Sequence, residues 1–199
     1  MNDSDIRLRD ELIRKSIHAA SLWIPLGYRF FPKRCILIPL AVLLGIALLV
    51  EVLRSVWTPF EARFERFLGS LLRPRERTNL TGATTLLISA FLCIVFFEKW
   101  IALLAILLML VSDALGAVVG RFWGRRYYKK GRSIEGSMAF LVSGLALIPV
   151  VPEVNLPIAV VGVLAALFFE VALTKLDDNF GVPIGSGLVM EILALFFGA

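Results

Sequence analysis

Apolar stretches recur along the chain from residue 16 to its end, and short polar links separate them. A helix that crosses the hydrocarbon core of a bilayer needs about 20 mostly apolar residues. Seven stretches approach this length. They are Ser16–Phe31, Cys35–Leu53, Leu80–Phe97, Trp100–Val119, Ser137–Val151, Leu156–Leu173 and Val182–Phe197. The pattern predicts an all-α integral membrane protein, a polytopic bundle of about seven transmembrane helices that forms a single membrane domain over residues 1–199.

The link between the second and third predicted spans is longer than the others and has a mixed character. Within residues 54–79, phenylalanine and leucine side chains alternate with arginines at the spacing of a helix with one apolar and one basic face. We therefore expect residues 54–79 to be an amphipathic cytoplasmic segment, with a helix that lies on the membrane surface.

The composition narrows the functional classes. Of the 199 residues, 58% are hydrophobic and 19% are charged, and the mean hydropathy is +0.83. A water-soluble domain of this size must cover most of its surface with polar groups, so the composition excludes a soluble globular enzyme. It also excludes a disordered chain, because charged residues are sparse. A disulfide scaffold is excluded because the only two cysteines, Cys35 and Cys93, lie inside apolar stretches.

The net charge of +5 is distributed unevenly along the chain. With seven crossings, the N-terminus and three of the links lie on one face of the membrane. Of the 21 lysines and arginines, only Arg29, Lys33, Arg34 and Lys99 fall on the other face. The positive-inside rule makes the basic face cytoplasmic. We therefore interpret the charge as membrane orientation rather than nucleic-acid binding, and we expect a cytoplasmic N-terminus and active site.

Asp113 lies within the fourth apolar stretch. An ionised carboxylate at membrane depth is costly unless it meets a cation, a metal ion or water, which makes Asp113 a candidate catalytic residue. A structural pair with a neighbouring arginine is the alternative. Gly116 and Gly120 follow on the same helix, where glycines favour close helix packing. The same bare surface would also let a ligand approach.

Residues 120–137 form a basic link that leads into the next apolar stretch. Its polar candidates are Lys130, Arg132, Ser133, Glu135, Gly136 and Ser137. At the N-terminus of a helix, free N–H groups and the positive end of the helix dipole attract phosphate oxygens, and basic side chains add charge-assisted hydrogen bonds. We therefore predict a phosphate-binding loop. A solvated loop that only follows the positive-inside rule is the alternative.

A group of acids and one amide follows the sixth stretch: Glu170, Asp177, Asp178 and Asn179. Magnesium prefers oxygen ligands and is often held by one or two carboxylates together with substrate phosphates. Asp113 with Asp177 and Asp178 would therefore suffice to hold a nucleotide-bound magnesium ion. A helix cap and turn explain the Asp-Asp-Asn run equally well.

Two weaker groups complete the predicted cytoplasmic face. They are Glu11, Arg14, Lys15 and His18, at helical spacing around the start of the first stretch, and Asn79 with Thr81 at the start of the third. His18 is the sole histidine, which favours a hydrogen bond to a phosphate or to a structural partner over a histidine metal site. Thr81 and Asn79 also suit a helix N-cap. All five groups meet the membrane from one side, which favours a single shared site.

These motifs, taken in order, resemble the polyprenol kinase family. That family includes dolichol kinases, phytol kinases and the CTP-dependent diacylglycerol kinases of fungi, and it is distantly related to the phosphatidate cytidylyltransferases. The resemblance rests on Glu11–His18, Ser112–Ala114, Arg132–Ser137, and Glu170 with Asp177–Asn179 and Val182–Pro183, and it runs over most of the chain. The chain departs from the family at Arg132, where lysine is usual. Arginine keeps the positive charge but is not a neutral replacement for a lysine that acts as a point charge.

The resemblance implies transfer of the γ-phosphoryl group of CTP, with Mg²⁺, to the hydroxyl of a membrane lipid alcohol such as polyprenol or dolichol, phytol or diacylglycerol. It implies that either Asp113 or Glu170 accepts the hydroxyl proton. It further implies three groups of binding residues. The triphosphate would be held by Arg14, Lys15, Lys130, Arg132, Ser133, Glu135, Gly136 and Ser137, the metal by Asp113, Asp177 and Asp178, and the site would be lined by Glu11, His18, Asn79, Thr81, Gly116, Gly120 and Asn179. An oligomer is compatible with the sequence.

Three other functions use some of the same features. A phosphatidate cytidylyltransferase would attack the α-phosphate of CTP, but the chain lacks the Lys-Asp and His-Gly-Gly signature of that enzyme. A small transporter would use Asp113 and Glu170 as relay carboxylates, yet it needs polar access from both faces, and the opposite face offers few polar residues. A purely structural membrane protein is the remaining alternative.

Overall fold

The computed structural model describes residues 16–72, 74–129, 132–172 and 177–198. Helices dominate these residues, as the all-α prediction requires. They are α2 (Trp23–Phe30), α3 (Lys33–Val56), α4 (Thr58–Leu68), α5 (Gly82–Phe96), α6 (Lys99–Leu107), α7 (Asp113–Trp123), α8 (Ile134–Leu147), α9 (Leu156–Ala172) and α10 (Asp178–Phe197), with shorter turns η2 (Pro74–Arg77), η3 (Leu108–Ser112) and η4 (Ile148–Val150). Residues 16–20 are also helical.

Three helices among the described residues are long and apolar enough to cross a membrane: Lys33–Val56, Lys99–Trp123 and Asp178–Phe197. The apolar helices at 82–96, 134–150 and 156–172 are shorter. The chain is therefore an integral membrane protein, and seven complete spans are not confirmed.

The first predicted span is interrupted rather than continuous. A turn at residues 21–22 separates the helical residues 16–20 from α2. Pro25 has no N–H to donate to the carbonyl oxygen of Ser21, and this oxygen instead accepts from the nearer N–H of Ile24 at 3.0 Å. The proline thus accounts for the break.

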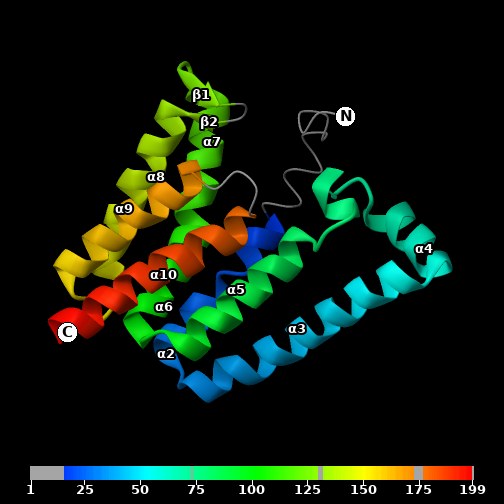
Figure 1. Cartoon of the computed structure of the whole chain (residues 1–199), viewed down its shortest axis with the longest axis horizontal. Helices are drawn as coiled ribbons and strands as arrows, with labels where there is room; N and C mark the ends of the chain where they lie inside the picture. The colour runs from blue at the N-terminus through cyan, green and yellow to red at the C-terminus, as the bar shows by residue number, and fades with distance from the viewer. Residues whose placement is uncertain (1–15, 73, 130–131, 173–176, 199) are drawn as a thin grey trace.

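The bundle is built around α6, in which every residue from Trp100 to Leu107 is buried. Helix α10 packs against α9, α5 and α6, and α8 packs against α7 and α9. Figure 1 shows α3 at the edge of the molecule, with α4 at its far end. The core therefore lies among α5, α6, α8, α9 and α10, and α3 is peripheral.

Helices α6 and α7 are joined by a π-helical turn, η3, in which the N–H of Asp113 donates to the carbonyl oxygen of Leu108. A π-helical turn adds one residue to the helix and rotates everything after it by about 100°. Because of this rotation, the side chains of α7 point in other directions than a continuous α-helix from α6 would give them. Asp113, the first residue of α7, is only partly buried.

Glycines allow α7 and α8 to approach closely. A Cβ atom added at Gly136 would lie 2.7 Å from the carbonyl oxygen of Gly116 and 3.1 Å from the Cα atom of Gly120. Both neighbours are backbone atoms and cannot rotate away. The packing explanation for Gly116 and Gly120 is therefore realised in the fold.

Two predicted segments differ from the structure in their boundaries. Helix α4 ends at Leu68, and only η2 continues the amphipathic segment, because Gly69 favours a helix end and Pro74 cannot donate a helical hydrogen bond. Helix α7 extends to Trp123, so the basic link begins at Gly124 rather than at residue 120. The link then forms a small antiparallel ribbon of β1 (Tyr127–Lys129) and β2 (Arg132–Ser133), which an all-α prediction omits.

Candidate functional site

A cavity of about 680 Å³ lies between the helical residues 16–20, α3, α5, α7, α8 and the start of α10. Charged and polar side chains line one part of it. They are His18, Ser21, Asp113, Arg132, Ser133, Ser137, Glu170, Asp177, Asp178, Asn179, Thr81, Thr84, Glu51 and Glu76. Aliphatic and aromatic side chains line the rest. One cavity therefore joins a polar region to an apolar one.

Arg132 is the centre of the polar region. Its Nη2 atom lies 2.8 Å from Oδ1 of Asp178, and its Nη1 atom lies 3.2 Å from Oε1 of Glu170. Only 17% of the arginine side chain is exposed. Burial alone would lower the pKa of Arg132, but the charges of Asp178 and Glu170 outweigh burial and raise it. The guanidinium therefore stays positively charged and links the starts of α8 and α10 to the end of α9.

The basic link is shaped by its own side chains. Oγ of Ser133 accepts from the N–H of Gly136 at 3.1 Å and so caps α8. The carboxylate of Glu135 accepts from the N–H groups of Arg125 and Arg126 at 3.1 and 3.3 Å. Glu135 does not line the cavity. Within the described residues, its contacts hold the backbone of the link in place.

The start of α10 contains both a helix cap and an ion-paired acid. Oδ1 of Asp177 accepts from the N–H of Asn179 at 2.9 Å, which makes Asp177 the N-cap. Asp178 instead pairs with Arg132. The side-chain amide of Asn179 donates to the carbonyl oxygen of Gly82 at 3.3 Å. The cap alternative for the Asp-Asp-Asn run therefore describes Asp177, and Asp178 serves a different contact.

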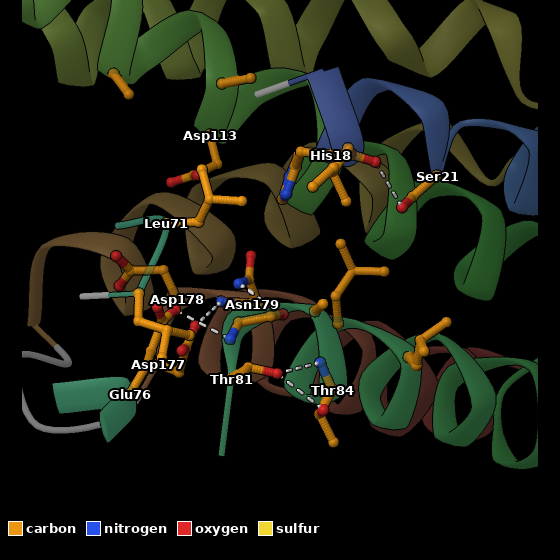
Figure 2. Close-up of a pocket in the computed structure, with 18 of the residues that line it drawn as sticks. His18, Ser21, Leu71, Glu76, Thr81, Thr84, Asp113, Asp177, Asp178 and Asn179 are labelled. Atoms are coloured by element: carbon orange, nitrogen blue, oxygen red, sulfur yellow. Dashed lines mark hydrogen bonds between the residues drawn. The ribbon is translucent and has the colours of Figure 1, made fainter. Parts of the chain in front are cut away.

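Asp113 and His18 lie on the opposite side of the cavity from Asp177, Asp178 and Asn179, as Figure 2 shows. Nε2 of His18 lies 3.2 Å from the carbonyl oxygen of Met109, within the π-helical turn. A carbonyl oxygen only accepts, so Nε2 carries the hydrogen in this contact. His18 thus ties the helical residues 16–20 to the turn that orients Asp113.

A buried network that the sequence analysis did not identify lies beside these residues. Oε1 of Glu51 accepts from the N–H of Thr81 at 2.8 Å and from the hydroxyl of Thr84 at 2.9 Å, and Oε2 pairs with Arg54 at 2.8 Å. Arg54 also donates to the carbonyl oxygen of Glu76 at 2.8 Å. Glu51 and Arg54 each expose only 8% of their surface. An acid and a base three residues apart at the end of an apolar helix were the sequence signal for this network.

The remaining predicted site residues have different placements. Gly116, Gly120, Gly136 and Thr81 line the cavity. Asn79 does not line it, because its amide donates to the carbonyl oxygen of Arg75 and its own carbonyl accepts from Arg54. Glu11, Arg14, Lys15 and Lys130 lie outside the described residues.

The donor set of the cavity suits a hard cation, since its acids offer carboxylate oxygens. Among the described residues, however, no three acid, histidine or cysteine side chains come close enough together to hold a metal ion. The described residues alone therefore do not supply a complete set of metal ligands. Such a donor set fits a magnesium ion that takes further ligands from substrate phosphates.

Comparison with known proteins identifies relatives over most of the chain. The chain is 28% identical over 182 residues to an uncharacterized protein of Rickettsia prowazekii. This alignment covers 86% of this chain and 88% of the relative. It is 25% identical to CTP-dependent diacylglycerol kinase 1 of Eremothecium gossypii, over 96% of this chain and 70% of the relative. It is also 25% identical to CTP-dependent diacylglycerol kinase 1 of Saccharomyces cerevisiae, over 97% of this chain and 77% of the relative.

No protein-family model matches the chain, and no solved structure matches it significantly. The curated relatives nevertheless confirm the resemblance drawn from the motifs, because proteins of the diacylglycerol kinase type align with nearly the whole chain. The chain is similar to the CTP-dependent diacylglycerol kinases over nearly its whole length.

Proposed function

We propose that the protein is a CTP-dependent lipid kinase that transfers the γ-phosphoryl group of CTP to the hydroxyl of a membrane lipid alcohol. The observation that carries the proposal is the cavity, which joins a cluster of charged side chains to an apolar region within a membrane-embedded bundle. Such a cavity suits one polar and one apolar reactant. The names of the fungal relatives supply the choice of CTP and support lipid phosphorylation.

The nucleotide would lie at the start of α8. The N-terminal N–H groups of a helix favour phosphate oxygens, and this end of α8 lies beside Arg132. In the proposal, Arg132, Ser133, Gly136 and Ser137 hold the triphosphate from this side. Lys130, Arg14 and Lys15 add positive charge, as the family resemblance implies.

Magnesium would be held by Asp113 together with Asp177 or Asp178, whose carboxylates line the same cavity. When bound, it would neutralise charge on the phosphates and help to align them.

The transfer itself breaks one bond and forms another. The lipid hydroxyl oxygen bonds to the γ-phosphorus, the bond from that phosphorus to the β,γ-bridging oxygen breaks, and CDP leaves. The hydroxyl proton needs an acceptor. We assign this role to Asp113, which lines the cavity; the other candidate, Glu170, forms an ion pair with Arg132 at 3.2 Å. Glu170 is then a positioning residue that keeps Arg132 directed at the phosphates.

The orientation follows from the distribution of charge. We propose seven membrane crossings with the N-terminus and the site on the cytoplasmic side, where CTP is available. The shorter helices and the interrupted first segment would cross within the bundle, where neighbouring helices satisfy and shield the broken backbone.

The position of the transferred label tests this proposal. Purified protein in detergent micelles is incubated with CTP labelled at the γ- or the α-phosphate, magnesium, and a panel of diacylglycerol, prenyl alcohols and phosphatidate. We expect γ-label on an alcohol. Transfer of α-label to phosphatidate would instead show a cytidylyltransferase. Failure to label any lipid, in protein that remains folded, would contradict an enzymatic role.

A further inference from the structure

Helix α3 is held to the bundle at its two ends but not along its middle. Its buried residues are Ile36 and Leu40 near the start, and Glu51 and Arg54 near the end. None of residues 41–50, all of which the structure describes, is buried. Transmembrane helices associate mainly through close van der Waals packing. The unpacked middle of α3 is therefore a place where the bundle leaves room for something apolar.

The cavity lies behind this part of α3. Leu43, Ala47 and Val50 line it, at the i, i+4 and i+7 spacing of one helical stripe. Ile17 and Ala20 line the cavity from residues 16–20, and Leu86 and Leu87 line it from α5. Each of these side chains is apolar. The slot between α3 and the bundle is thus walled by hydrocarbon on several sides.

The slot is continuous with the polar region of the site. The stripe Leu43, Ala47 and Val50 ends at Glu51, which also lines the cavity and begins the buried network with Thr81 and Thr84. Any molecule in the slot would therefore have its apolar end beside α3 and its polar end toward Asp113 and Arg132. This polarity matches a lipid alcohol whose hydroxyl is the reacting group.

We propose that the slot between the middle of α3 and α5 binds the hydrocarbon tail of the lipid substrate, and that Ala47 sets the length and bulk of tail that fits. The inference rests on the proposed kinase function and adds the place of the tail and the residue that limits it. Ala47 has the smallest side chain in the stripe and lies between Leu43 and Val50. A larger side chain there would occupy the middle of the slot.

The first test substitutes Ala47→Phe and compares substrates of different length. The pairs are dioctanoylglycerol with dioleoylglycerol, and geraniol with geranylgeraniol, all with γ-labelled CTP. A phenylalanine ring at position 47 would overlap the longer tail, so kcat/KM for the longer member should fall on the order of tenfold, with at most about a twofold change for the shorter member. KM for CTP should not change.

Ile46→Phe is the matched control. Ile46 is the neighbouring residue on α3, 55% exposed, and it does not line the cavity. It is rotated from Ala47 by about 100° around the helix, toward the bilayer. The same added ring at this position should leave the ratio of long to short substrate unchanged. Equal ratios for Ala47→Phe, Ile46→Phe and the unaltered protein would overturn the inference.

A second variant guards against misfolding of the first. Leu43→Ala removes bulk from the same stripe and widens the slot. It should therefore raise the ratio of kcat/KM for the longer substrate to that for the shorter one by a few-fold. If Ala47→Phe does not fold in detergent, an unchanged ratio in Leu43→Ala refutes the tail slot. If the unaltered protein phosphorylates none of the alcohols, the proposed kinase function fails, and that result is distinct from a kinase whose tail preference ignores Ala47.

Discussion

At the scale of single residues, Arg132 makes the contacts that most constrain the proposed chemistry. It lies between Asp178 and Glu170, which come from different helices. Sequence alone placed all three residues near the same membrane face, because they flank successive apolar stretches. It did not show that the arginine contacts both acids, since that pairing depends on how α8, α9 and α10 converge. The structure thus adds a partner for each acid.

Removing the charge of Arg132 should weaken nucleotide binding. In Arg132→Gln, the loss of charge-assisted hydrogen bonds should raise KM for CTP on the order of tenfold or more. Arg132→Lys should lose less affinity than Arg132→Gln, because a lysine keeps the positive charge, but it cannot reach Asp178 and Glu170 with two separate nitrogens. Initial rates measured over a range of CTP concentrations check both variants. Equal KM values for all three proteins would contradict a phosphate contact.

The two candidate carboxylates should separate in their kinetics. If Asp113 accepts the hydroxyl proton, Asp113→Asn should lower kcat by about 10²-fold or more. Glu170→Gln should mainly raise KM for CTP, by about three- to tenfold, because it acts through Arg132. Steady-state kinetics with saturating lipid measure the split. A larger loss of kcat in Glu170→Gln than in Asp113→Asn would reverse the two assignments.

The buried network around Glu51 should contribute to stability. Arg54→Met removes the partner of Glu51 and leaves that carboxylate buried, which should destabilise the fold by about 3 kcal/mol. Thermal unfolding in detergent measures the change. Arg77→Met is the control, since Arg77 pairs with Glu65 at 3.6 Å on the exposed surface, and such pairs contribute little. A loss of similar size in both variants would contradict the network's role.

At the scale of helices, the apolar pattern predicted most of the elements and missed the local irregularities. The third, fourth and sixth predicted stretches correspond to α5, to α6 with α7, and to α9. The π-helical turn before Asp113 has no signal in an uninterrupted run of leucine and valine. The short β-ribbon was missed because basic and glycine residues in a link suit many turns. Hydrophobic periodicity thus predicts where helices lie and says little about their bends.

The crossing of α7 and α8 should tolerate no side chain at its closest point. Gly136→Ala places a Cβ atom against the backbone of Gly116 and Gly120, so it should push the two helices apart. We expect a loss of about 1–3 kcal/mol in the free energy of unfolding, and a lower activity. Gly45→Ala on α3 is the matched control, because a Cβ atom there meets nothing within 4 Å. It should be neutral or slightly stabilising. The measurements are the thermal unfolding and the kinase activity of both variants. A Gly136→Ala protein with unchanged stability and activity would contradict the close crossing of α7 and α8.

At the scale of the whole molecule, membrane location is the property that the sequence predicted most directly. Three described helices are long and apolar enough to span a bilayer, whereas α2 and the helices of 15 to 17 residues are shorter than the seven-span prediction assumed. The cavity could not be predicted, because its apolar part depends on how far α3 stands from the bundle. Figure 1 shows α3 at the edge of the molecule, beside α5.

The central claim is that charged and apolar parts of one cavity bring a nucleotide and a lipid alcohol together for phosphoryl transfer. The most direct measurement is the rate at which γ-label from CTP appears on extracted lipid, for the unaltered protein and for Asp113→Asn at matched folding. We expect labelled lipid phosphate with the unaltered protein and a rate lower by about 10²-fold with Asp113→Asn. Equal rates for the two proteins, or label that never leaves CTP in the presence of folded protein, would contradict it.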